Sequence, residues 1–93
     1  MKKLFFHKFN KKLYEIKLSN RTDSSDGSCD DPSTKKKTIV IKEKLNPKRK
    51  LEVFIHEALH ALFWNLEEET VTNSAEDIGK FLWKLGYRKI EDE

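Results

Sequence analysis

Residues 13–18 follow a period of two, with Tyr14, Ile16 and Leu18 on one side and Glu15 and Lys17 on the other. A period of two is typical of a strand that buries one face and exposes the other. Residues 38–45 begin with β-branched side chains and then alternate, which predicts a second strand. We expect these two strands to pair antiparallel in a small sheet.

The segments around the first strand carry weaker signals. Four apolar residues precede it in an irregular pattern and either extend the strand or cover one end of the core: Leu4, Phe5, Phe6 and Phe9. Residues 19–37 are rich in Ser, Thr, Asp and Lys and offer almost nothing to bury. This composition predicts a long, flexible loop.

The pair Asn46-Pro47 ends the second strand and predicts the start of a helix. Asparagine accepts hydrogen bonds from the first free amides of a helix, and the fixed φ of proline suits the first turn. Apolar residues then recur at helical spacing and form the predicted core stripe, namely Leu51, Ile55, Ala58, Leu59 and Leu62. We expect this helix to end near residues 65–66.

A second helix is predicted to start at the three glutamates of residues 67–69, because negative charge is favourable at a helix N-terminus. Gly86 predicts its end. Its expected core stripe is Val71, Ala75, Ile78 and Leu82, broadened by Phe81 and Leu85. The short connection makes the two helices antiparallel. The pattern therefore predicts a single α+β domain over residues 1–93, with the sheet packed by both helices.

Positive charge is concentrated in the first half of the 93-residue chain. Residues 1–50 carry 15 Lys and Arg against 6 Asp and Glu, a net charge of +9, whereas residues 51–93 carry 4 against 10, a net charge of −6. A basic half can bind nucleic acid or an acidic partner. These lysines, however, alternate with apolar strand residues, and no arginine-rich run or stacking motif accompanies them. We therefore interpret them as a solvated sheet face and expect no nucleic-acid partner.

Two features bear on location. No apolar run approaches the roughly 20 residues of a membrane-spanning helix, and Lys8 and Lys11 interrupt the opening segment before a signal-peptide core could form. Cys29 is the only cysteine, which excludes an intrachain disulfide and suits a reducing compartment. We expect a cytoplasmic protein without a membrane partner.

The first predicted helix contains His56-Glu57-Ala58-Leu59-His60, a match to the pattern H-E-x-x-H. Histidines four residues apart lie one turn apart on one helix face, so both imidazoles can bind one Zn²⁺ at about 2.0–2.1 Å. Glu57 lies at the edge of that face, where its carboxylate can take a proton from water and deliver it to a leaving amine. The alternative to a metal site is that the two histidines and Glu57 lie on the solvent side of an amphipathic helix. The apolar segments 53–55 and 61–64 argue against it, because they flank the motif.

A zinc site with two histidines needs a third protein ligand and leaves one position for water. One turn before Val71, the core stripe of the second helix reaches Glu68, which should face inward. Glu69 lies on a polar row and is the alternative ligand. Weaker candidates at the helix end and on the polar row are Glu67 and Glu76. Cys29 and the aspartates that follow it would join the site only if their loop folded over it.

Two histidines of an HExxH helix and a carboxylate from the next helix resemble the ligand set of the zincin metallopeptidases, specifically the gluzincins. Further stretches, spread over about two thirds of the chain, are similar to small metallopeptidases of phages and bacteria: residues 27–34, 37–41, 51–61 and 68–88. The resemblance implies a minimal zincin-like core, in which a small antiparallel sheet packs against an active-site helix and a ligand-bearing helix.

The same resemblance implies a function. It implies Zn²⁺ bound by His56, His60 and Glu68, and hydrolysis of a peptide or protein substrate with Glu57 as general base and then acid. In zincins an extended peptide adds to a sheet edge beside the active helix, and by analogy residues 38–45 could offer that edge. The chain is too short for a second domain to wall a substrate cleft. The alternative is therefore a catalytically silent zincin-like module that binds zinc and serves binding or regulation.

Overall fold

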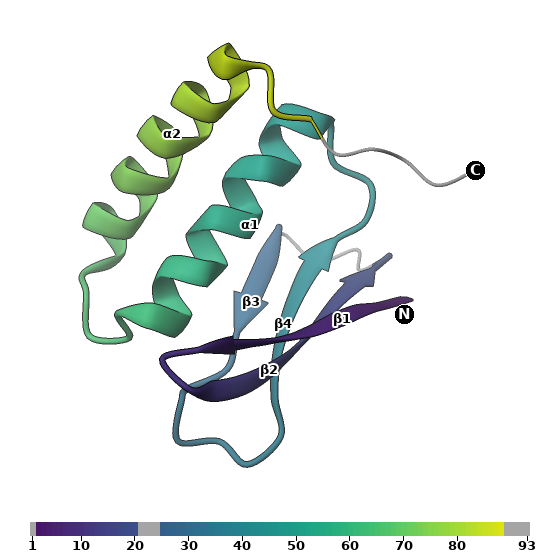
Figure 1. Ribbon diagram of the computed structural model, residues 1–93, viewed down its shortest axis with the longest axis vertical. Coiled ribbons are helices and arrows are strands. Elements are labelled where there is room, and N and C mark those ends of the chain that lie inside the picture. Colours follow the sequence, from purple (N-terminus) through teal and green to yellow (C-terminus); the bar gives the residue numbers. More distant parts are fainter. Residues whose placement is uncertain (1, 21–24, 89–93) are drawn as a thin grey trace.

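Two helices lie on one side of a four-stranded mixed sheet in the computed structural model, which describes residues 2–20 and 25–88 (Figure 1). This confirms the α+β class expected from the sequence. Neither helix of the described ranges is long and apolar enough to cross a membrane. In chain order the elements are β1 (Lys2–Phe9), β2 (Lys12–Ser19), β3 (Gly27–Cys29), β4 (Lys37–Lys42), α1 (Pro47–Leu62) and α2 (Glu68–Leu85).

The irregular apolar segment before the first predicted strand forms a strand of its own, β1, which pairs antiparallel with β2. The two residues between these strands, Asn10 and Lys11, have positive φ angles of 51° and 67°. Two such residues make the tight turn whose twist suits a hairpin, and asparagine adopts this conformation more readily than most residues. The Asn10 side chain donates a hydrogen bond of 3.0 Å to the carbonyl of Leu62. The turn is thereby tied to the end of α1.

The sheet has the order β1-β2-β4-β3, and β2 and β4 run parallel. The expected antiparallel pairing of these two strands was therefore wrong. The cause is β3, a strand of three residues inside the predicted loop 19–37, which pairs antiparallel with β4 and reverses the chain before β4 begins. Residues 21–24 of that loop lie outside the described residues. Because β4 lies between β2 and β3, it cannot offer the sheet edge that the family resemblance suggested for residues 38–45.

The core lies between the sheet and α1. Its fully or almost fully buried strand residues alternate as predicted: Tyr14, Ile16, Leu18, Ile39 and Ile41. The predicted core stripe of α1 was wrong in detail, because its residues are only half-buried and the buried row is Val53, Glu57 and Ala61. The sequence stripe was chosen from apolar residues alone, whereas the row against the sheet includes a glutamate.

Helix α2 packs against α1 and leaves much of its own apolar surface exposed. Val71 and Ala75 are buried as predicted, but Gly79 continues the buried row and Ile78 is 39% exposed. A Cβ atom on Gly79 would lie 2.7 Å from Cγ of Glu52, so the absence of a side chain allows α2 to approach α1 closely there. The contact of α2 with α1 therefore runs along α2 residues that are four apart in the sequence. Phe81 and Leu85 lie off this row and are exposed, which corrects their expected place in the stripe.

Substitutions at two neighbouring residues of β4 can test the location of the core. Ile41 is fully buried against α1, whereas Val40 points to the opposite face and is half-buried. We predict that Ile41→Ala lowers the free energy of unfolding by about 2–5 kcal/mol, because truncation leaves a cavity. Val40→Ala should lower it by about 1 kcal/mol or less. Urea denaturation followed by circular dichroism measures both changes, and equal losses would contradict this assignment of the core.

Candidate metal centre

The two motif histidines lie on one face of α1. Asn46 caps the helix as predicted, because its side chain accepts a hydrogen bond of 2.9 Å from the backbone N–H of Arg49, and Pro47 follows in the first turn. The helix then continues without interruption to Leu62, so His56 and His60 lie one turn apart. Their Nε2 atoms are 3.1 Å apart. The four-residue separation of the two histidines in the sequence therefore brings their ring nitrogens close together in the structure.

Glu68 completes the cluster from the first residue of α2. The backbone N–H of Phe63 donates to the carbonyl of Leu59 at the end of α1, and a tight turn then leads directly into α2. This brings Oε1 of Glu68 to 2.9 Å from Nε2 of His56, and Oε2 to 2.8 Å from Nε2 of His60. The expectation that Glu68 faces inward is confirmed. Of the glutamates considered with it, only Glu68 belongs to a cluster of possible metal ligands among the described residues.

The three side chains fit a divalent cation. One ligand atom from each residue lies within 4.8 Å of the others. A tetrahedral Zn²⁺ with bonds of about 2.0–2.1 Å holds its ligand atoms roughly 3.3 Å apart, close to the separations at this site. Two imidazoles and a carboxylate are also a common donor set for catalytic zinc. Because the Glu68 side chain is 67% exposed, the cluster is open to solvent on one side.

Electrostatics favour the neutral state of one histidine. Burial lowers the pKa of His56, and the neighbouring His60 and Arg49 lower it further, while Glu68 raises it. A neutral imidazole keeps a lone pair on one ring nitrogen, which is the form that binds a metal. The surroundings of His56 thus favour the protonation state that a ligand needs.

Comparison of the chain with protein-family models, with curated proteins and with solved structures gave no match. The case for a metal centre therefore depends on the arrangement of these side chains. That arrangement can hold a cation through two nitrogens and a carboxylate, with one side accessible to water and to a further ligand.

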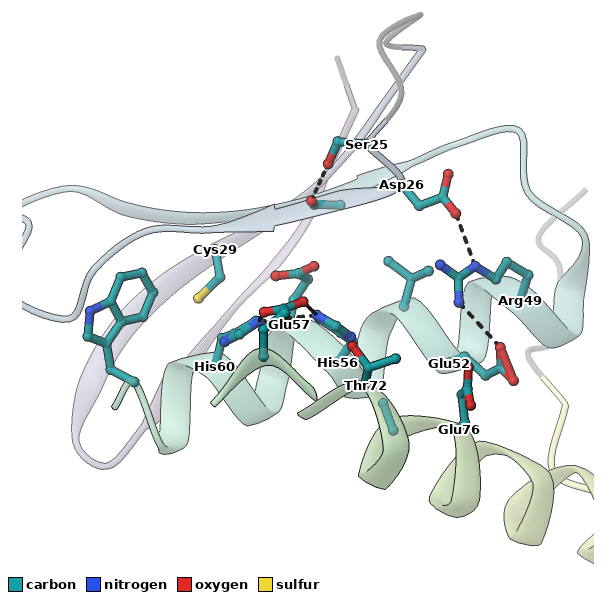
Figure 2. Close-up of a pocket in the computed structure, with 15 residues that line it drawn as sticks. Ser25, Asp26, Cys29, Arg49, Glu52, His56, Glu57, His60, Thr72 and Glu76 are labelled. Carbon is teal, nitrogen blue, oxygen red and sulfur yellow. Dashed lines mark hydrogen bonds and ion pairs between the residues drawn. The ribbon is translucent and has the colours of Figure 1, made fainter. Parts of the chain in front are cut away.

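Glu57 occupies the side of α1 that faces the sheet, and it is only 6% exposed. The close approach of α1 to β3 at this point requires Gly27. A Cβ atom on Gly27 would lie 2.8 Å from Cγ1 of Val53 and 3.1 Å from Oε2 of Glu57. Figure 2 shows Glu57 between the two histidines on α1, with β3 across the cleft. A buried carboxylate therefore lies next to the candidate ligands, as the H-E-x-x-H pattern predicts.

A cleft of about 530 Å³ contains this site, and β3, α1 and α2 line it. At one end Arg49 pairs with Asp26 at 3.0 Å and with Glu52 at 3.4 Å (Figure 2). At the other end Trp64 packs edge-on against His60, with ring centroids 6.3 Å apart. Sequence reasoning missed these lining residues. The spacing of Arg49 and Glu52 could have suggested a pair on one helix face, but nothing in the pattern joins Asp26 to them.

Cys29 lines the cleft without belonging to the ligand cluster. The two aspartates that follow Cys29 accept hydrogen bonds from nearby residues of the chain instead. Asp30 accepts hydrogen bonds from the backbone and hydroxyl of Thr38, and Asp31 accepts one from the backbone of Ser33. Burial, followed by the charge of Glu57, raises the pKa of the Cys29 thiol to about 12. The thiol is therefore protonated at neutral pH in the metal-free protein, and Cys29 lies outside the cluster of possible ligands found among the described residues.

The raised pKa predicts low reactivity of this thiol. Near pH 9, the ordinary pKa of a thiol, Cys29 should react with iodoacetamide about a hundredfold more slowly in the folded protein than in guanidinium chloride, because only the thiolate reacts. Glu57→Gln should speed the reaction of the folded protein, since it removes a negative charge that disfavours the thiolate. Mass spectrometry of the alkylated fraction over time measures both rates. Equal rates in folded and unfolded protein would contradict the assigned environment.

Proposed function

We propose that the chain is a zinc-dependent peptidase of the zincin type. His56, His60 and Glu68 would bind Zn²⁺, and Glu57 would act on the reacting water. The observation that carries the proposal is the convergence of two Nε2 atoms and a carboxylate within 3.1 Å of one another, beside a buried glutamate in the same cleft. Imidazole and carboxylate together favour zinc among the common divalent ions.

Glu57 would move the protons of the reaction. Bound zinc would lower the pKa of a water molecule and polarise the substrate carbonyl. The carboxylate of Glu57 would take a proton from the attacking water and then give it to the leaving amine nitrogen, so that no net proton remains on the enzyme. The α1 backbone holds Glu57 between the two proposed ligands.

The proposed substrate is an extended peptide that pairs with β3. In the described part of the chain, β3 pairs as a strand only with β4, and its Gly27 carbonyl accepts a hydrogen bond of 2.6 Å from the Ser25 hydroxyl, so a peptide would pair with the remaining backbone groups of the other edge. Backbone hydrogen bonds to such an edge would hold a peptide across the site without requiring a particular sequence. A substrate in the cytoplasm of a bacterial or phage-infected cell is compatible with the single cysteine, which needs no oxidising compartment.

The choice of third ligand can be tested with adjacent glutamates. We predict one Zn²⁺ per chain in the wild-type protein, bound at least about a hundredfold more weakly in His56→Ala and Glu68→Ala, because each variant loses a direct ligand. Glu69→Ala is the matched control, since it removes the same charge from the same helix turn. It should change the affinity by no more than about twofold. Isothermal titration calorimetry measures the Zn²⁺ affinity of each variant. Loss of Zn²⁺ binding in Glu69→Ala but not in Glu68→Ala would identify Glu69 as the third ligand instead.

The catalytic role of Glu57 has a separate test. Glu57→Gln should keep Zn²⁺ and lose about 10²–10⁴-fold in kcat/KM, because an amide cannot accept the proton of water. Cleavage of a quenched fluorescent peptide library, with and without a chelator, provides the measurement. Retained turnover in Glu57→Gln would remove this residue from the mechanism. If the wild-type protein binds Zn²⁺ and cleaves nothing, the chain is instead a zinc-binding module without hydrolysis.

A further inference from the structure

The strand β1 forms the sheet edge that is remote from the metal cluster. The order β1-β2-β4-β3 places two strands between β1 and β3, and the residues that line the cleft come from β3 and the helices but not from β1 (Figure 1). Within the described ranges β1 pairs only with β2. Its eight residues therefore present a row of backbone donors and acceptors on their outer side.

An apolar groove runs along the inner side of this edge. We call it the β1 groove; its volume is about 320 Å³, and its walls are Phe5, His7 and Phe9 from β1 and Phe54, Ile55 and Ala58 from α1. Phe5 pairs across the sheet with the buried Ile16, yet its side chain is 53% exposed. Helix α1 covers the middle of the sheet but leaves this strand partly open. An added strand could bury the exposed part of Phe5.

The opposite face of the same edge is basic. By the strand register this face of β1 and β2 carries Lys3, Lys8 and Lys17 and one acidic residue, Glu15. Lys2 and Lys12 instead pair with Leu18 and Phe9 on the α1 side of the sheet. Glu15 already has two lysine partners, Lys17 at 3.1 Å and Lys3 at 3.7 Å. Lys3 also lies over the ring of Phe6, 5.0 Å from its centroid. Three lysines against one glutamate leave a net charge of +2 on the strand face that points away from the β1 groove.

We propose that β1 binds an extended polypeptide segment with alternating apolar and acidic side chains, which would join the sheet as a fifth strand. Side chains of an added strand alternate between the two faces. One set would enter the β1 groove, and the other would lie among the lysines of the opposite face. Charge complementarity favours this partner over a second copy, because two β1 strands paired with each other would place lysines against lysines. The proposal does not depend on zinc or on hydrolysis.

Two neighbouring phenylalanines provide a matched test. Phe5 and Phe6 are equally exposed, at 53% each, but lie on opposite faces of β1. The probe is a capped peptide of alternating valine and glutamate, labelled for fluorescence anisotropy. We expect Phe5→Ser to weaken its binding at least about tenfold, because valine loses its apolar contact in the groove. Phe6→Ser should change the Kd by about twofold or less, since the acidic side chains of the probe face the lysines there. Circular dichroism and Zn²⁺ binding check that both variants are folded.

Charge and backbone pairing are tested with the wild-type protein and one more variant. A valine–lysine peptide should bind much more weakly, as should a valine–glutamate peptide with a central proline, which interrupts strand pairing. Lys8→Glu should weaken the acidic probe and improve the basic one. Equal effects of Phe5→Ser and Phe6→Ser, or equal binding of all peptides, would overturn the proposal. So would Phe5-dependent dimerisation in analytical ultracentrifugation, or Phe5-dependent binding to phosphatidylserine vesicles without binding of the peptide.

Discussion

The position of α1 between the sheet and α2 determines the geometry of the whole site. Residues four apart on a helix share a row, and adjacent rows point in different directions. The row of Val53, Glu57 and Ala61 is buried against the sheet. The neighbouring row contains Glu52, His56 and His60 and faces α2, where it meets Gly79 and Glu68. One helix therefore places a buried carboxylate and two imidazoles on adjacent rows, and all three side chains line the same cleft.

Two glycines allow these contacts to be close. Gly79 lets α2 approach α1 at Glu52, and Gly27 lets β3 approach α1 at Val53 and Glu57. A side chain at either position would require neighbouring groups to shift, and a metal site tolerates displacements of only a few tenths of an ångström in its ligands. Burial of Glu57 in an otherwise apolar row removes water from its carboxylate, and an interaction within the protein takes the place of part of that hydration.

The sequence predicted those features that depend on local periodicity and chemistry. The start of α1 at Asn46-Pro47, the end of α2 at Gly86, and the inward direction of Glu68 follow from capping rules and helical spacing. The parallel pairing of β2 and β4 did not follow, because β3 has only three residues and too short a pattern to detect. The ion pair between Asp26 and Arg49 depends on that same strand, so the end of the cleft could not be predicted either.

The two edges of the sheet differ in ways that separate their proposed roles. β3 is short, lies beside the histidines and Glu57, and can hold a peptide only over a few residues. β1 is longer, and its neighbours are apolar on one face and basic on the other. Lysines on an exposed edge usually oppose association with other strands. The same charges would oppose a second copy and attract an acidic partner. β1 would select what it binds by charge, whereas β3 would bind a substrate mainly through its backbone.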